Sequence, residues 1–541
     1  MRHFLHLDGV VRIVLLTAAA TALLLLGAGP ASAATLNVCP SGCPYTQIAT
    51  ALAAATDGDT IAIAPGTYAG GFTIEVSVKL AGAGAGRTTI SGGGPVVTIG
   101  EFGASTEPTV SIDGVTITGG VTRSSWAAAF VGDGVIALGG GVEIPPNANF
   151  TGGATVTITN SVVTGNRVAP TQTIPSGLPC PGGEECPFAL AAGGGIDSWG
   201  TLTLANTTIS NNRVGSASGL STLASDADGG GIMNQLGALA ISNSVISGNE
   251  VSATGPNGRF AEAGGIFAFG PTITVSNSSV THNSATLAAS LPNSVELGAN
   301  GGGFHITSDV AAATITNTTI SRNSVTMTNT VGDVDAFSGG VHIDLGVDFK
   351  LSNSIVADNS VTSATLAGST GNAGGDSGAG ELLGRISNTR ITGNSVTVSS
   401  AAGDATALAG AIIDFGSITN SVLSDNHIEV SSPGGTVFAA GGALVVDEPG
   451  VTLHNTPVNG NTIHAVGASG SAQGGGIFDG PVPDGPPGGP LALVNSDVTG
   501  NVLSGSGGIT LQGGGLYIQN KPFTSTNSTI SGNSPDQCFG C

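Results

Sequence analysis

Apolar and polar residues alternate in short runs along most of the chain, as in Thr155–Ile158 and Thr201–Leu204. Alternation with a period of two, carried by Thr, Val, Ile and Leu, predicts strands that bury one face. Turns rich in Gly, Asn and Ser separate these runs, and no stretch between them has the helical length that a βαβ crossover needs. We therefore expect an all-β protein built from many short strands.

The runs belong to a repeat. The seven-residue pattern Asn-(Ser/Thr)-x-(aliphatic)-x-x-Asn occurs eleven times at a mean spacing of about 37 residues. Its first Asn stands at positions 160, 206, 243, 277, 317, 353, 388, 420, 455, 495 and 527, and the second Asn follows six residues later. A Gly-rich segment that leads into a short apolar strand lies between copies, starting at Gly139, Gly193, Gly229, Gly264, Gly301, Gly339, Gly441, Gly474 and Gly513. This second motif is degraded between Gly378 and Ala411.

Stacked repeats of this length predict a single parallel β-helix of about a dozen turns, with about three strands in each turn. The inward positions then form aliphatic columns, such as Val163, Ile209, Ile246, Val280, Ile320 and Val356. Asn at a fixed turn position can bond its own backbone and the Asn of the next turn. We expect both Asn columns to be structural.

The paired motifs, a GGGI-like segment and Ile-x-x-Asn (Ile209–Asn212, Ile246–Asn249), resemble the GGAI and FxxN repeats of chlamydial polymorphic outer-membrane proteins. They are also similar to right-handed β-helix repeats of the pectin-lyase-like superfamily. Residues 45–68 look like that superfamily's N-terminal capping helix and first strand. The resemblance implies a right-handed helix. The chain has Ile or Val where the chlamydial repeat has Phe, and it shows no autotransporter barrel, which argues against surface display by that route.

The N-terminus predicts export. Arg2 and Arg12 precede an apolar stretch over residues 13–28, and Ala31-Ser32-Ala33 has the form of a cleavage site. The alternative is an uncleaved membrane anchor, although the apolar stretch is short for that role. We expect a signal peptide over 1–33, an N-terminal cap with a short helix over 34–66, the β-helix over 67–533 and a tail over 534–541. No later apolar run is long enough to predict a membrane span in the mature chain.

The six cysteines form three local pairs, Cys39 with Cys43, Cys180 with Cys186 and Cys538 with Cys541. Short, even spacing in an exported chain favours three local disulfides. A zinc site made by the first and last pairs would join opposite ends of the sequence. A redox role for the terminal Cys-Phe-Gly-Cys lacks the strand-helix context of such motifs.

Charge excludes several classes of partner. The 541 residues include 89 Gly, only 9% are charged, and 13 Lys and Arg face 35 Asp and Glu, for a formal net charge of −22. Nucleic acid binding needs clustered cations, so we expect no nucleic acid partner, and polyanionic substrates are disfavoured on the same ground. Gly at repeated turns accounts for much of the Gly excess.

One column of charged residues is a candidate catalytic site. It stands one position before the second Asn and holds His282, Arg322, Asp358 and Asp425 in nearby repeats. Asp358 and Asp425 would lie two turns apart, with backbones about 9–10 Å from each other, near the upper end of the spacing used by inverting glycosidases. The alternative, which we favour, is an exposed ladder of opposite charges.

A second column follows each Gly-rich segment and includes Asp197, Met233, Phe267, His305, His342, Leu383 and Ile413. With residues two positions further on, it offers a face on which sugar rings could stack. The candidate binding residues are Trp199, Phe267, Phe269, His305, His342 and Asp344. The alternative, which we favour, is that the insertions before each Gly run fold over this face and bury it as a satellite cluster.

Metal chemistry has little support in the sequence, and we expect no metal site. The alternative is a Ca²⁺ site made by the acidic pair Asp226/Asp228 or Asp333/Asp335, which could supply oxygen ligands. Neither pair matches a known calcium-binding loop. For a polysaccharide lyase, the resemblance to the pectin-lyase-like superfamily implies acidic Ca²⁺ ligands and a basic residue that accepts the proton, and this sequence has no matching Asp cluster with a nearby Arg or Lys. Arg167, Arg213 and Glu250 in successive repeats predict an ion-pair ladder.

The sequence thus predicts a secreted or surface-associated monomer with a non-catalytic role in adhesion or in binding a neutral glycan. The alternative is a carbohydrate-active enzyme, a hydrolase or lyase that works in a groove along the helix.

Overall fold

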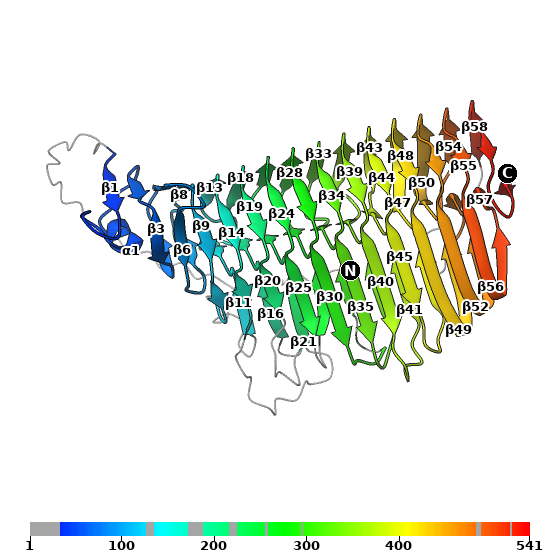
Figure 1. The fold of residues 1–541 in the computed structure, drawn as a ribbon, viewed down its shortest axis with the longest axis horizontal. Coiled ribbons are helices and arrows are strands. Elements are labelled where there is room, and N and C mark those ends of the chain that lie inside the picture. Colours follow the sequence, from blue (N-terminus) through cyan, green and yellow to red (C-terminus); the bar gives the residue numbers. More distant parts are fainter. Residues whose placement is uncertain are drawn as a thin grey trace, which may run out of the picture.

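The alternating runs fold into strands that stack turn upon turn as a parallel β-helix (Figure 1). This computed structural model describes residues 33–125, 135–170, 188–215, 224–254, 258–293, 295, 297–482, 488–519 and 522–541. The stack runs from β1 (Thr35–Val38) and helix α1 (Ile48–Leu52) at the N-terminal end to β58 (Phe523–Thr526) and β60 (Cys538–Phe539) at the other. The predicted all-β parallel β-helix is confirmed.

In the described residues the strands form three long sheets with 27, 19 and 14 strands, which we call sheets A, C and B. The turn that starts at residue 266 shows the pattern. Sheet A receives β27 (Ile266–Ala268) and β28 (Thr272–Ser276), sheet B receives β29 (Ser279–Thr281), and sheet C receives β30 (Ser284–Ala289) and β31 (Gly298–Asn300). A full turn therefore holds five strands rather than the three that we expected, because the insertions before the Gly runs themselves form strands of sheet C.

Two apolar cores run along the molecule. The larger lies between sheets A and B and contains the predicted aliphatic column, in which Val163, Ile209 and Ile246 pair in register and are fully buried. A second core, rich in Ala and Val, joins the paired sheet C strands of each turn, as Val251, Ala253 and Ala261 do. In Figure 1 the sheet C strands form the lower half of the stack, and sheets A and B form the upper half.

The second Asn of the repeat forms a continuous buried ladder. The Nδ2 of Asn323 donates to Oδ1 of Asn359 on the next turn (2.9 Å), and its Oδ1 accepts from Nδ2 of Asn283 on the preceding turn (3.0 Å). The same bonds link all eleven turns from Asn166 to Asn533. The prediction that this column is structural is confirmed.

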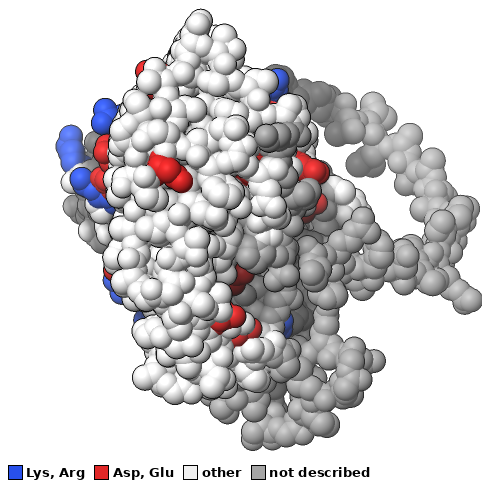
Figure 2. All heavy atoms as spheres, turned by 90° about the vertical axis from the view of Figure 1, so that its right-hand side faces the viewer, with Lys and Arg blue, Asp and Glu red and all other residues white. Residues whose placement is uncertain are grey.

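The first Asn of every repeat adopts a left-handed backbone, with φ between 49° and 52°. Asn tolerates this region better than other residues that carry a Cβ, so it suits a turn that recurs in each repeat. Figure 2 shows the molecule from its C-terminal end, where uncharged surface dominates and Lys and Arg are visible mainly along the left edge.

The ends of the chain carry local cystine bridges. Cys39 and Cys43 are joined with an S–S length of 2.04 Å, and Cys538 is paired with Cys541. Cys180 and Cys186 lie outside the described residues, as do residues 1–32 of the predicted signal peptide. Within the described part of the chain, α1 buries Ile48 and Leu52 against the first turns, and no helix there is long and apolar enough to cross a membrane.

Candidate functional site

In each turn a residue with a left-handed backbone joins the second sheet C strand to the first sheet A strand. We call this place the corner. It is occupied by Gly139, Gly193, Gly229, Ala263, Gly301, Ser338, Ser377, Ala409, Gly441, Gly474 and Gly513, with φ between 47° and 71°. Two residues after the corner, successive turns lie close together. A Cβ added to Gly303, for example, would lie 2.5 Å from the carbonyl oxygen of Gly340 on the next turn. The repeated Gly motif is therefore the sequence signal for this bend.

The corner is concave, so side chains that point away from the main core are nevertheless buried. Phe267 at the centre of β27 is 3% exposed, and His305 at the centre of β32 (Phe304–Ile306) is 6% exposed. They meet side chains from sheet C, as when the rings of Phe337 and His342 lie 6.2 Å apart. Phe267 and His305 are therefore buried between sheets A and C, whereas Trp199, Phe269, His342 and Asp344 are half-buried.

Apolar clusters lie near both ends of the corner, although the buried carboxyls of Glu143 and Asp197 also stand near its N-terminal end, and the histidines are confined to the middle. An apolar cluster near its N-terminal end contains Ile136, Leu138, Ala192, Met233, Ala263 and Phe267. Another near its C-terminal end contains Ala409, Ala440, Val445, Phe478 and Tyr517. The turns between them hold histidines and carboxylates, which makes this middle section the candidate site.

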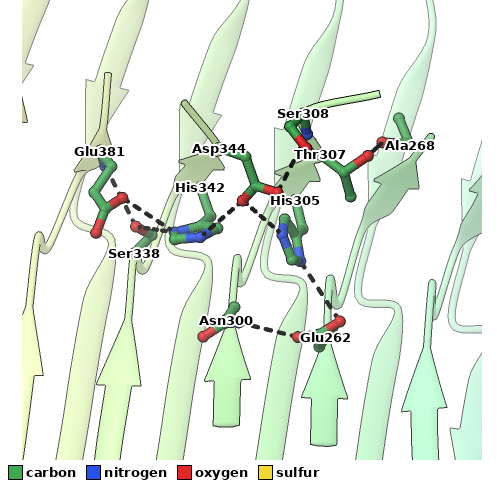
Figure 3. Close-up of polar contacts among 10 residues, drawn as sticks. All are labelled: Glu262, Ala268, Asn300, His305, Thr307, Ser308, Ser338, His342, Asp344 and Glu381. Atoms are coloured by element: carbon green, nitrogen blue, oxygen red, sulfur yellow. Dashed lines mark hydrogen bonds and ion pairs between the residues drawn. The ribbon is translucent and has the colours of Figure 1, made fainter. Parts of the chain in front are cut away.

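Two histidines and an aspartate converge there (Figure 3). His305 on β32 pairs in register with His342 on β37 (Val341–Ile343), and Asp344 follows two residues later on the same side. The Nε2 atoms of both histidines lie 3.5 Å from Oδ1 of Asp344. The two imidazole rings meet edge to face with centroids 4.7 Å apart.

A second carboxylate lies behind each histidine. The Nδ1 of His305 is 3.7 Å from Oε2 of Glu262, and the Nδ1 of His342 is 3.7 Å from Oε2 of Glu381. Asn300 donates to Glu262 (3.0 Å), and Ser338 Oγ lies 3.1 Å from Nδ1 of His342. Each imidazole is thus held between two carboxylates, as Figure 3 shows.

The electrostatics favour positive charge at this place. Burial acts to raise the pKa of Asp344, but hydrogen bonds from His305 and His342 outweigh it and hold that pKa well below its ordinary value. Burial also acts to lower the pKa of His342, and the carboxylates of Glu381 and Asp344 outweigh it, so the net shift is upward. A protonated His342 imidazole beside these carboxylates is therefore favoured.

A cavity of about 760 Å³ adjoins the cluster, and Glu381 belongs to both. Its walls come from sheet C strands β36 (Val334–Phe337), β41 (Ala373–Asp376) and β46 (Ala405–Leu408), and from the sheet A side of the corner. The carboxylates on these walls are Asp333, Asp335, Asp376, Glu381, Asp404 and Asp447, and apolar walls include Phe337, Leu345, Leu383, Val445 and Val482.

Four of the six cavity carboxyls, those of Asp335, Asp376, Glu381 and Asp447, have pKa values above their ordinary values. Desolvation by the cavity walls raises the pKa of Asp335 to about 7, and the negative charges of Glu381 and Asp333 add to the shift, although part of this side chain is open to solvent. Burial, followed by the charges of Glu381 and Asp335, raises the pKa of Asp376 well above its ordinary value. In the described residues, Oδ1 of Asp376 has no hydrogen-bond partner.

The candidate binding residues are only partly grouped. Phe267 stacks on His305 with ring centroids 4.6 Å apart and touches Phe269 at 4.5 Å, next to His342 and Asp344. Trp199 instead packs against Phe150, with centroids 6.0 Å apart, at an earlier turn. Phe267 is buried, so it offers no open platform for a sugar ring.

The candidate catalytic residues lie elsewhere, on an exposed turn between sheets B and C. His282, Arg322, Asp358 and Asp425 all have φ between 55° and 58° at a position that is mostly Gly in other turns. Arg322 and Asp358 approach to 3.7 Å with more than half of each side chain exposed. Arg213 and Glu250 form the expected ladder pair at 3.2 Å. The charge-ladder alternative describes these positions.

The sequence pattern did not predict three carboxylates of this region, Glu262, Asp376 and Glu381. From the sequence we expected Leu383 to be the residue stacked on His342 in the next turn. In the structure Val341 pairs with Gly380, and the residue beside His342 is therefore Glu381. Aligning the left-handed Ser338 with Ser377 would have found it. Of the acidic pairs considered for Ca²⁺, Asp333 and Asp335 line the cavity, while Asp226 and Asp228 lie on β21 (Ala224–Asp228).

Comparison with known proteins adds little. No protein-family model matches the chain, and no curated protein matches it. Among solved structures it is similar to the catalytic domain of a GH87 alpha-1,3-glucanase in complex with nigerose, at 14% identity, over 94% of this chain and 70% of that chain, with a TM-score of 0.24. A superposition this loose carries no argument about the site, and the resemblance to pectin-lyase-like proteins stays a prediction.

Proposed function

We propose that this protein is exported and binds a neutral glycan in the cavity at the corner. The observation that carries the proposal is the cavity itself, about 760 Å³, with carboxylates and apolar side chains from successive turns on its walls. Sites for small ligands in proteins typically enclose about 300–1,000 Å³ and combine apolar walls with a few polar groups.

The lining suits a sugar. Oxygens of acidic side chains accept hydrogen bonds from hydroxyl groups, and six acidic side chains line the cavity. Leu345, which is 67% exposed at the cavity wall, offers apolar surface to the C–H face of a sugar ring. An anionic glycan would meet a cavity lined by six acidic side chains and no basic one, and it is disfavoured for the same reason that the net charge of −22 disfavours polyanions.

A glycan array that holds neutral and acidic oligosaccharides tests the proposal. The wild-type chain should bind neutral glycans, and Asp376→Asn should weaken that binding because an amide presents one acceptor where the carboxyl presented two. Asp358→Asn is the matched control, since this carboxylate lies outside the cavity on an exposed turn. Preferential binding of acidic glycans, or equal loss in both variants, would refute a neutral-glycan site in this cavity.

Glycoside hydrolysis is a second candidate, and one observation favours it. The pKa of Asp335, raised to about 7, keeps this carboxyl partly protonated near neutral pH beside other cavity carboxylates. We assign Asp335 as the proton donor to the glycosidic oxygen, while water supplies the hydroxyl group that completes hydrolysis. Product release from array glycans should stop in Asp335→Asn while binding persists, and release that persists in this variant would clear Asp335 of that role.

A further inference from the structure

We propose that His305, His342 and Asp344 bind one divalent transition-metal ion of the zinc class. One potential ligand atom from each residue lies within 4.8 Å of the other two. Two ligands about 2.0–2.1 Å from a tetrahedral ion are separated by about 3.3 Å. The Nε2 to Oδ1 distances of 3.5 Å are close to this value, and the two imidazoles, whose ligand atoms lie within 4.8 Å of each other, would draw closer together to share the ion.

The backbone fixes these atoms before any ion arrives. His305 and His342 are directly opposed in a parallel ladder, and His342 and Asp344 project from the same side of one strand segment. Asp344 is held further by Ser308, whose backbone N–H donates to Oδ2 at 3.2 Å and leaves Oδ1 facing the histidines. A site built on paired strands in this way is well ordered.

The outer partners have the arrangement that metal-binding histidines use. Each imidazole turns Nε2 toward Asp344 and Nδ1 toward a second carboxylate, Glu262 for His305 and Glu381 for His342. Such carboxylates orient the ring and raise its basicity as a ligand. Glu262 is itself fixed by a hydrogen bond from Asn300 (3.0 Å).

The donor set selects the ion. Two imidazole nitrogens and one carboxylate oxygen suit Zn²⁺ and its neighbours, whereas Ca²⁺ and Mg²⁺ prefer sites made of oxygen. His305 and His342 are 7% and 13% exposed in their side chains, but Asp344 is 35% exposed. Solvent or a ligand can therefore reach a further coordination position on the Asp344 side.

The charges also call for a cation. Glu262, Asp344 and Glu381 bring three carboxylates to the cluster, and all their ion pairs in the described residues are with the two histidines. Protons on both imidazoles would leave one negative charge, so protonated histidines are the competing explanation. A bound dication with neutral imidazoles as ligands would leave the same single negative charge, so the charge count fits either explanation and the ligand geometry favours the ion.

Metal titration separates these explanations without any glycan. The full chain, stripped with a chelator, should bind one Zn²⁺ per chain by calorimetry, and Co²⁺ should give the visible absorption of a nitrogen- and oxygen-ligated site. Asp344→Ala and His342→Ala should each abolish measurable binding. Glu381→Gln should weaken binding by about 10–100-fold, as loss of an outer partner does.

The double variant His427→Asn/His464→Asn is the matched control, because these histidines bond Thr462 and Ser504 on sheet C, away from the corner. It should bind Zn²⁺ as the wild type does. Asp344→Ala decides the matter if the histidine variants do not fold, since its carboxylate is partly exposed. Absence of stoichiometric binding, or equal affinity in a folded Asp344→Ala variant, would overturn the proposal.

Discussion

His305 and His342 stand one repeat apart in the sequence but directly opposite each other in the structure, with both Nε2 atoms 3.5 Å from the same oxygen of Asp344. Parallel stacking produces this relationship, because it places equivalent positions of successive repeats about 4.8 Å apart. An ion bound there would link two turns of the β-helix.

Zn²⁺ should therefore stabilise the folded chain. At a free concentration 100 times the dissociation constant, binding to the native state alone adds about 2.7 kcal/mol. Scanning calorimetry should show a higher melting temperature for the wild type with Zn²⁺ and no rise for Asp344→Ala. A rise of equal size in both proteins would place the ion elsewhere.

The Asn ladder should be a major source of stability. The side chain of Asn323 makes four hydrogen bonds, two accepted from Asn283 and two donated, to Val280 O and Asn359 Oδ1. Asn323→Ala leaves several buried groups unpaired and should cost about 3–5 kcal/mol, measured by denaturant unfolding. Asn317→Gly, at an exposed left-handed turn that suits Gly, should cost less than about 1 kcal/mol. Equal losses would contradict the ladder's role.

Buried carboxyls should make the protein more stable as the pH falls from 7 toward 5. Burial raises the pKa of Asp197 to about 7, against about 3.9 in an unfolded chain. Between about pH 4 and pH 7 the native state therefore keeps a proton on Asp197 that the unfolded state has lost. The contribution of Asp197 to the free energy of unfolding is fully present below about pH 4 and is lost as the pH rises through about 7. Asp226 shifts in the same direction.

Melting temperatures from pH 5 to pH 8 test this dependence. Asp197→Asn should flatten the pH profile, because the amide does not titrate and can still accept the hydrogen bond from Gln235 (3.3 Å). Above neutral pH the free energy of unfolding of Asp197→Asn should exceed that of the wild type, by on the order of 4 kcal/mol at most. Parallel profiles for the two proteins would show that Asp197 does not carry the effect.

The exposed charge column should be dispensable. Arg322 has a left-handed backbone, and its ion pair with Asp358 at 3.7 Å is largely solvated, so it contributes little. Arg322→Gly removes the backbone strain that a residue with a Cβ has at positive φ, which stabilises the native state. It also raises the conformational entropy of the unfolded chain, and the two effects on the free energy of unfolding nearly cancel. Unfolding should shift by less than about 1 kcal/mol, and array binding should be unchanged; a loss of binding would restore this column as a candidate site.

The fold could be predicted because its main signals are local and repeated. An Asn at every buried ladder position and a Gly at most corners follow from stacking contacts that recur in each turn, as Asn323 and Gly303 illustrate. Five strands per turn could not be predicted as readily, because the sheet C strands lie within insertions of variable length and sequence.

The site could be predicted only in part. Repeat spacing grouped His305, His342 and Asp344, but strand alternation indicated an outward, sugar-stacking face. Only the packing of sheet C against sheet A makes that face the wall of a concave corner and brings Glu262 to His305. Glu381 was missed because the Gly motif that sets the register is degraded at that turn.

The central claim is that the corner cavity is the place where a glycan binds. Calorimetric titration of the strongest neutral oligosaccharide from the array into Leu345→Trp tests it most directly, because this change adds bulk at the cavity wall and keeps every carboxylate. Ile355→Trp, at an exposed site on β39 (Ile355–Ala357) of sheet B, is the control. We predict that Leu345→Trp loses at least about tenfold in affinity, or about 1.4 kcal/mol, while Ile355→Trp binds like the wild type. Unchanged affinity in Leu345→Trp would contradict the account.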